Sequence, residues 1–138
     1  MIPAHLLAAA ARHARACFPA ECCGYLTADA IVECRNAQVD GDHPTHPERG
    51  PETGFVIAGA ELLAFARSFD GPAPARVVYH SHPNGRAYFS DVDRDNARTA
   101  GYPVHHLVIG VTAAGATEAA LFTVDGIEVA RWPAAVLG

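Results

Sequence analysis

The chain lacks a concentration of positive charge, a long uninterrupted apolar run and a basic N-terminal start. Its 138 residues carry ten Lys and Arg, scattered along the chain, against fifteen Asp and Glu, for a net charge of -5. This balance gives no electrostatic footprint for nucleic acid. Charged and turn residues interrupt the apolar-leaning stretches, so we expect no membrane span. The first residues do not resemble a secretory signal, which predicts a cytoplasmic protein.

Cysteine is also scarce, and its spacing is not that of a metal or redox motif. The four cysteines, Cys17, Cys22, Cys23 and Cys34, form no Cys-x-x-Cys pair. Cys22 and Cys23 are adjacent, which is poor geometry for a bridge between them. In a chain without an export signal we interpret all four as reduced thiols. Their simplest role is that of small apolar core residues.

Length and composition favour one domain, residues 1–138, in which half of the residues are apolar. The residue pattern predicts helices over 4–16, 61–69 and 90–100, and strands over 22–27, 31–35, 55–57, 76–82, 104–111, 118–124 and 127–132. These elements do not alternate regularly as strand–helix–strand units. We therefore expect a mixed α/β (α+β) fold around one curved sheet.

Residues 36–54 are rich in Gly and Pro and poor in apolar groups, so they are expected to form a loop. The loop is longer than most connections, and such loops tend to be functional or mobile. It carries His43 and His46, which we interpret as exposed loop residues, with contact to metal or substrate as the alternative.

Two histidines near the middle of the chain have the spacing of metal ligands. His80 and His82 lie at the end of a predicted strand, and side chains two residues apart in a strand project to the same face. Asp93 follows in the first turn of the next predicted helix, after Pro83 and a glycine that allow the chain to turn back. Two imidazoles, one carboxylate and a water form an ordinary ligand set for catalytic Zn²⁺, since a catalytic site keeps one position open.

Each half of this pattern has a simpler reading when taken alone. His80-x-His82 is a weak signal, and Ser90-x-x-Asp93 is the pattern of a helix capping box. Ser90-x-x-Asp93 can be a capping box and also supply a metal ligand, because a capped helix start is a rigid platform for a ligand. The combination predicts a metal site.

A metal-dependent hydrolase also needs a group that moves protons. Glu21 lies between a proline and an apolar strand, and it is either an exposed acid in a turn or the general base that faces the bound water. Ser90 is a candidate for donating its hydroxyl to a tetrahedral oxyanion. Tyr88 and Phe89 are candidates for lining the substrate channel or for packing in the core.

Taken together, Glu21, the run His80-Ser81-His82-Pro83, Ser90 and Asp93 resemble the pattern of the JAMM metalloproteases, also called the MPN-plus or Mov34/JAB1 group. That pattern is an upstream Glu, then H-x-H-P, then S-x-x-D. The resemblance covers about residues 3 to 124 and is strongest to the small prokaryotic members. It departs at Phe89, where many members have proline.

The resemblance implies a curved, partly closed β-sheet flanked by helices, with a layout like that of cytidine deaminases. It implies His80, His82 and Asp93 as zinc ligands, Glu21 as general acid and base, and Ser90 as the group that steadies the intermediate. The implied activity is a zinc-dependent metallopeptidase or isopeptidase that cleaves after the C-terminal glycines of a ubiquitin-like or sulfur-carrier protein.

Two other functions stay open at this stage. One is a non-catalytic, metal-bearing MPN interaction module, which the complete ligand set disfavours. The other is a RadC-like domain, which shares H-x-H-P followed by Ser-x-x-Asp; Glu21 and the Cys-Gly strand after it favour the peptidase. The sequence leaves open the natural substrate, the substrate-binding residues and the oligomeric state. It also does not separate precursor processing, isopeptide removal and cysteine release.

Overall fold

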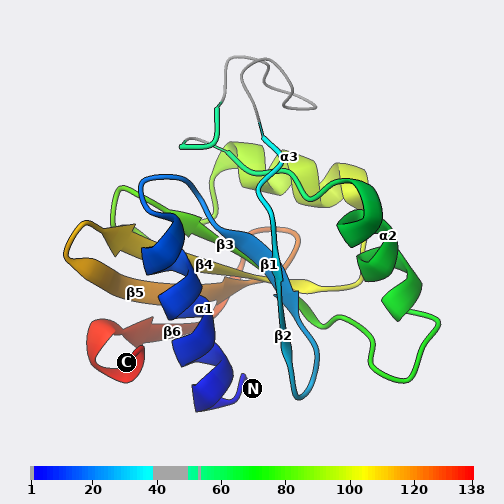
Figure 1. Ribbon diagram of the computed structural model, residues 1–138, viewed down its shortest axis with the longest axis horizontal. Helices are drawn as coiled ribbons and strands as arrows, with labels where there is room; N and C mark the ends of the chain where they lie inside the picture. The colour runs from blue at the N-terminus through cyan, green and yellow to red at the C-terminus, as the bar shows by residue number, and fades with distance from the viewer. Residues whose placement is uncertain (1, 39–49, 53) are drawn as a thin grey trace.

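The protein is described by a computed structural model, which places residues 2–38, 50–52 and 54–138 (Figure 1). The elements in chain order are α1 (Ala4–Cys17), β1 (Cys23–Leu26), β2 (Ile31–Cys34), α2 (Gly59–Ser68), β3 (Val77–His82), α3 (Asp91–Ala100), β4 (His105–Thr112), β5 (Gly115–Phe122), β6 (Glu128–Pro133) and the short 3-10 helix η1 (Ala134–Val136). The mixed α+β class expected from the sequence is confirmed.

One sheet of six strands organises the molecule, in the order β2-β1-β3-β4-β5-β6. The central pair, β3 and β4, is parallel, and every other neighbouring pair is antiparallel. The parallel pair requires a crossover, and α3 supplies it. The sheet is not closed, since β2 and β6 form its two edges.

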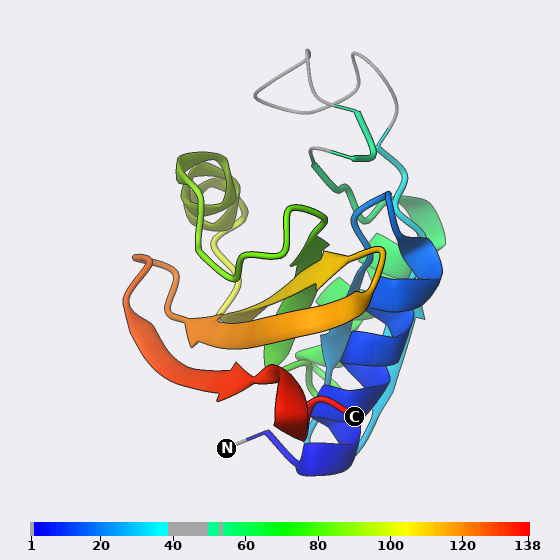
Figure 2. The same ribbon diagram turned by 90° about the vertical axis from the view of Figure 1, so that its left-hand side faces the viewer.

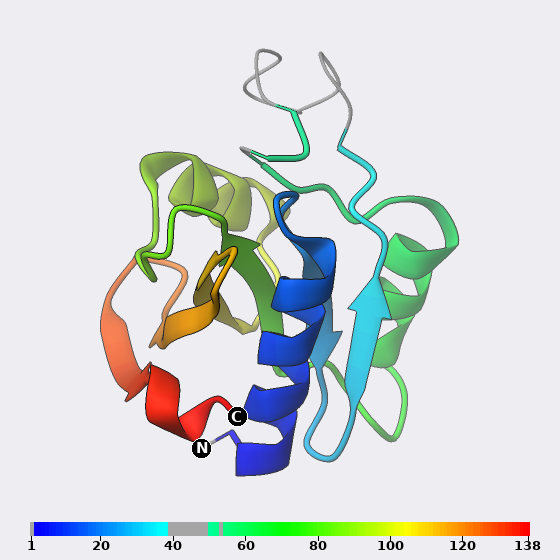
Figure 3. The ribbon, with the colours of Figure 1, turned by 60° about the vertical axis from the view of Figure 1, so that its left-hand side comes forward.

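Helices cover both faces of the sheet (Figures 1 and 2). The apolar side of α1 packs on one face, and both chain ends lie beside this helix in Figure 3. On the other face, Phe65 of α2 and Ala97 of α3 belong to two separate apolar clusters. Because strand side chains alternate, Tyr79 faces α1 while His80 and His82 face the side of α2 and α3. The alternation of β3 therefore brings both histidines to one face.

Three sequence predictions of secondary structure were wrong in detail. Residues 55–57 form no strand; Val56 instead accepts one backbone hydrogen bond, from Ala37 N–H at 2.8 Å, in the irregular segment that follows β2. Helix α2 begins at Gly59 rather than at residue 61. Strand β5 begins at Gly115, three residues early, because Thr112 and Gly115 pair across a tight turn.

The long loop predicted over 36–54 lies mostly outside the described residues, as do His43 and His46. Its described parts, residues 36–38, 50–52 and 54, belong to no helix or strand. The four cysteines are free thiols. Within the described ranges, no helix combines the length and the apolar character needed to cross a bilayer.

Candidate metal centre

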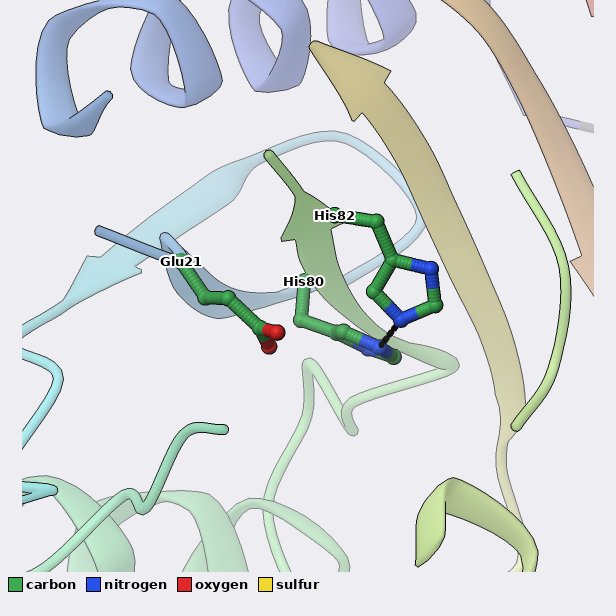
Figure 4. Close-up of side chains that lie close together, drawn as sticks. All are labelled: Glu21, His80 and His82. Carbon is green, nitrogen blue, oxygen red and sulfur yellow. Dashed lines mark hydrogen bonds between the residues drawn. The ribbon is translucent and has the colours of Figure 1, made fainter. Parts of the chain in front are cut away.

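The strand pairing around β3 explains why an acid from early in the chain reaches the two histidines. β1 runs antiparallel to β3 with Cys23 opposite His80. Continuing this register by two residues sets Glu21 beside His82, on the same face of the sheet. Figure 4 shows the Glu21 carboxylate directed toward the two imidazoles. Glu21 is buried, with 5% of its surface exposed.

The remaining site residues come from the start of α3. Ser90 is the N-cap: its Oγ accepts a hydrogen bond from Asp93 N–H at 3.0 Å, and its own N–H donates to Asp93 Oδ2 at 3.0 Å. This reciprocal capping box fixes the position of the Asp93 carboxylate. Because Ser90 Oγ is the acceptor in the cap, its hydroxyl proton remains available to a group in the cleft. The capping and catalytic readings of this motif are compatible.

Three potential ligand atoms meet in a nearly equilateral triangle. His80 Nε2 lies 3.1 Å from His82 Nε2, and each of these nitrogens lies 3.2 Å from Asp93 Oδ2. Bonds of about 2.0–2.1 Å directed tetrahedrally from one zinc ion would separate the ligand atoms by about 3.3 Å. The donor set and its spacing therefore fit a zinc ion.

Glu21 forms a second possible ligand group with the same histidines. One carboxylate oxygen of Glu21 and one ring nitrogen each of His80 and His82 all lie within 4.8 Å of one another. Both groups of three share the two histidines, but Asp93 contacts both imidazoles directly. We therefore assign Asp93 the closer position and Glu21 the neighbouring one.

A hydrogen bond outside the triangle fixes the tautomer of His82. Its Nδ1 lies 3.2 Å from the carbonyl oxygen of Arg86, so Nδ1 carries the proton and donates. The lone pair of Nε2 then points toward His80 and Asp93, as a metal ligand requires. The ring of His80 stacks on Phe55 with centroids 4.5 Å apart. Both imidazoles are thus held before a metal arrives.

The charges of the three groups depend on one another. Burial alone would raise the pKa of Asp93, but the charge of His80 and the hydrogen bond with its imidazole outweigh burial and hold that pKa well below its usual range. Burial would lower the pKa of His80, yet the attraction of Asp93 raises it. For His82 burial dominates and the pKa is lowered. These directions keep Asp93 ionised and His82 neutral at pH 7, whereas the raised pKa of His80 means that metal binding would displace a proton from that ring.

The site opens into a cleft of about 220 Å³, lined in part by Glu21, His82, Ser90 and Asp93. Tyr88 borders this cleft: it is 44% exposed, and its ring centroid lies 4.6 Å from that of His82. A second, mainly apolar hollow of about 250 Å³ lies between α2 and α3 and also reaches Asp93. Tyr88 therefore lines the cleft. Phe89 is buried, lines the second hollow and stacks on Phe122 with centroids 5.5 Å apart.

Backbone contacts dock the loop between β3 and α3 onto the sheet. A Cβ atom on Gly110 would lie 2.6 Å from the backbone carbon and oxygen of Gly85, so only glycine fits at position 110. Glu118 Oε2 accepts from Ala87 N–H at 2.8 Å, and Arg131 Nη2 donates to Ala87 O at 2.9 Å. This clamp keeps the loop that precedes Ser90 against β5 and β6.

The structure thus brings together all five residues that the sequence singled out, Glu21, His80, His82, Ser90 and Asp93. Sequence reasoning missed the residues that support them. Glu118 and Arg131 hold the loop, and Asn36 bonds to the backbone of Glu21. No motif marks these three, because their partners are backbone atoms distant in the sequence.

Solved structures share this fold at low sequence identity. A JAB1/MPN domain protein from Archaeoglobus fulgidus is 15% identical with a TM-score of 0.55, and the match covers 94% of each chain. A protein from Desulfitobacterium hafniense is 23% identical with a TM-score of 0.56, over 91% of this chain and 83% of that one. A protein from Salinibacter ruber is 19% identical with a TM-score of 0.53, over 95% and 88%. These likenesses show the fold.

A comparison with curated proteins finds no significant match. The family model described as prokaryotic homologs of the JAB domain, however, matches residues 3–124. That match spans the sheet from β1 to β5, α1 to α3 and all five site residues. The chain therefore belongs to the family of prokaryotic homologues of the JAB domain.

Proposed function

We propose that the protein is a zinc-dependent metallopeptidase or isopeptidase of the JAMM type. The observation that carries this proposal is the triangle of His80 Nε2, His82 Nε2 and Asp93 Oδ2, with sides of 3.1–3.2 Å, next to a buried carboxylate. Three protein ligands with one open position are typical of catalytic zinc, whereas structural sites are closed by four. A scaffold that only bound metal would need no buried acid beside the ligands.

The chain's own groups divide the work of hydrolysis. His80, His82 and Asp93 would hold a zinc ion, which would supply a water of lowered pKa and polarise the substrate carbonyl. Glu21 takes the proton released by the attacking water and delivers it to the leaving nitrogen. Ser90 donates its hydroxyl to the oxyanion that develops on the carbonyl. The capping box keeps Ser90 and Asp93 at a fixed distance throughout.

The proposed substrate is the C-terminal tail of a ubiquitin-like or sulfur-carrier protein, cleaved after its terminal glycines. Membership of the JAB family and the resemblance of the whole motif set support this class. The open cleft, with Tyr88 on its border, has room for an extended chain with small side chains. The four free thiols support a reducing compartment, the cytoplasm.

The test is cleavage of a sulfur-carrier protein that bears a peptide extension after its C-terminal Gly-Gly, read by mass spectrometry. The zinc-loaded protein should release the extension at the glycine, and a chelator should abolish the release until zinc is restored. A second substrate with a lysine-linked tail separates isopeptide cleavage from precursor processing.

Zinc binding without cleavage of any carrier substrate would refute the peptidase and favour the non-catalytic module. Binding of duplex DNA at physiological salt, in the same preparation, would favour the RadC-like alternative.

A further inference from the structure

The side chain of Asn36, just after β2, joins two stretches of backbone that flank the candidate centre. Its Nδ2 donates to Glu21 O and to Gly54 O, both at 3.0 Å. Its Oδ1 accepts from Gln38 N–H at 3.0 Å and from Val56 N–H at 3.1 Å. Its Nδ2 also lies 3.4 Å from Pro51 O, the acceptor of Glu21 N–H, so one amide group makes five hydrogen bonds with main-chain atoms.

Only an amide of this length can make this set of bonds. Asn offers two N–H donors and an oxygen with two lone pairs, and here both ends are in use. An aspartate of the same shape has no donors, so its carboxylate would face the carbonyl oxygens of Glu21 and Gly54. Alanine would leave both sets of backbone groups without this partner.

The backbone at Glu21 depends on such bonds, because the strand that follows starts later. β1 begins at Cys23, so Glu21 lies outside the regular ladder. Its N–H donates to Pro51 O at 2.7 Å, its carbonyl accepts from Asn36, and the next N–H, of Cys22, donates to Ser81 Oγ at 2.8 Å. The direction of the Glu21 side chain is set by these three anchors.

The same amide holds the other wall of the site. Gly54 O and Val56 N–H, its partners there, lie on either side of Phe55. The Phe55 ring stacks on the imidazole of His80. Asn36 therefore fixes the segment that covers one metal-ligand candidate and the peptide that carries the acid. Its hydrogen-bond partners among the described residues do not include His80, His82 or Asp93.

We propose that Asn36 is a positioning residue that aligns Glu21 with the metal centre. This inference rests on the proposed function for its catalytic consequence, but the alignment itself can be measured without turnover. Loss of the amide leaves the three metal ligands in place and lets the Glu21 peptide shift. A misplacement of the proton-transfer group by about 1 Å lowers kcat on the order of 100-fold.

The test compares Asn36→Asp and Asn36→Ala with Ser68→Ala. Ser68 is a matched control because its Oγ also makes two backbone hydrogen bonds, to Phe65 O at 2.6 Å and from Ala75 N–H at 3.0 Å, at the C-terminal end of α2. Both Asn36 variants should lose kcat on the carrier substrate on the order of 100-fold. For Asn36→Asp, which keeps the acceptor that holds the segment over His80, KM and the zinc dissociation constant should stay within about twofold. Ser68→Ala should retain kcat.

Amide hydrogen exchange, followed by NMR in the metal-free protein, supplies a readout independent of activity. Asn36→Asp keeps an acceptor for Val56 N–H and Gln38 N–H, so those amides should remain protected while Glu21 N–H exchanges faster. In Asn36→Ala all three should exchange faster. Unchanged kcat in Asn36→Ala, or exchange that quickens uniformly over the molecule, would overturn the inference. A wild-type protein that cleaves nothing would refute the proposed function, and the exchange pattern would still decide whether Asn36 holds Glu21.

Discussion

Replacing Glu21 by glutamine separates the chemistry from the metal site. Gln has nearly the same shape, so the buried position of the side chain, 5% exposed, should be kept. The triangle of His80, His82 and Asp93 does not include Glu21, so zinc affinity should change by less than about tenfold, the lower bound for loss of an outer partner. A general acid–base group contributes about 10²–10⁴-fold, which corresponds to about 2.7–5.5 kcal/mol of transition-state stabilisation.

A second carboxylate in the cleft determines where the loss of kcat should fall within the range of about 10²–10⁴-fold. Glu52 is exposed and lines the same cleft, so it can carry part of the proton transfer in the Glu21→Gln protein. We expect a loss of about 10³-fold in kcat for Glu21→Gln, and a further loss when Glu52→Gln is added. KM should change little in either protein.

The assay measures kcat with the carrier–peptide fusion at saturating zinc, with zinc content determined on the same samples. Glu33→Gln is the control, since Glu33 lies near His13 of α1, is 57% exposed and should leave kcat unchanged. Two results would refute the reasoning. If Glu21→Gln retains kcat within threefold, Glu21 is not the acid–base group. If it loses zinc in proportion to activity, Glu21 is a ligand rather than a proton carrier.

Three further changes test the support of the site. Gly110→Ala forces a Cβ atom against the backbone of Gly85, so it should lower the free energy of unfolding by about 1–3 kcal/mol and weaken zinc binding. Gly71→Ala, whose added Cβ meets only ordinary contacts, should change neither quantity. Thermal melts and zinc titrations of both proteins measure the two effects. The hydrogen bond from Ala87 N–H lowers the pKa of Glu118, so ionised Glu118 stabilises the fold above its ordinary pKa, and this stability is lost as the pH falls through the lowered pKa. The Tm of Glu118→Gln should therefore drop less than the Tm of wild type between pH 7 and acid. An equal drop in both proteins would contradict the clamp. Asp93→Asn keeps an acceptor for Ser90 N–H, so its Tm should equal that of wild type. Its zinc affinity should fall by more than the roughly 10–100-fold that loss of a partner outside the ligand shell costs. Unchanged zinc affinity would exclude Asp93 as a ligand.

The grouping of the candidate metal ligands could be predicted from the sequence because its geometry is local. Period-two alternation in a strand puts His80 and His82 on one face whatever the rest of the chain does. A Ser-x-x-Asp capping box likewise fixes Asp93 relative to Ser90 within a single helical turn. The only non-local step is the turn between them, and Gly85, with φ of 79°, allows it.

The position of Glu21 could be predicted only from the resemblance. Its place beside His82 follows from the register of β1 on β3, which depends on pairing across more than fifty residues. Sequence alone does not fix that register, since a shift of one residue would turn Glu21 to the face of α1. In the structure Ser81 anchors the register: its N–H donates to Cys22 O at 3.2 Å and its Oγ accepts from Cys22 N–H at 2.8 Å.

The strand that was wrongly predicted at residues 55–57 also depended on pairing between distant segments. Three apolar residues favour a strand, but a strand exists only where another backbone lies alongside, and here the neighbour is the irregular segment that starts with Asn36. A side-chain amide replaces the sheet ladder in this region. Sequence patterns show which residues suit a helix or strand, but they do not show which groups distant in the sequence will form hydrogen bonds. The irregular backbone around Glu21 is held by such bonds.

Fixed candidate ligands and a carboxylate outside the regular ladder suit the two demands of the proposed mechanism. In that mechanism the metal ligands stay together whether or not substrate is present, and β3 and α3 supply rigid backbone for the three candidates. The acid of the proposed mechanism exchanges a proton with two different partners in one turnover, so its peptide needs firm anchoring with a side chain that can turn. Asn36 donates to Glu21 O and Ser81 Oγ accepts from Cys22 N–H, so both side chains hold main-chain atoms around Glu21 and not its carboxylate.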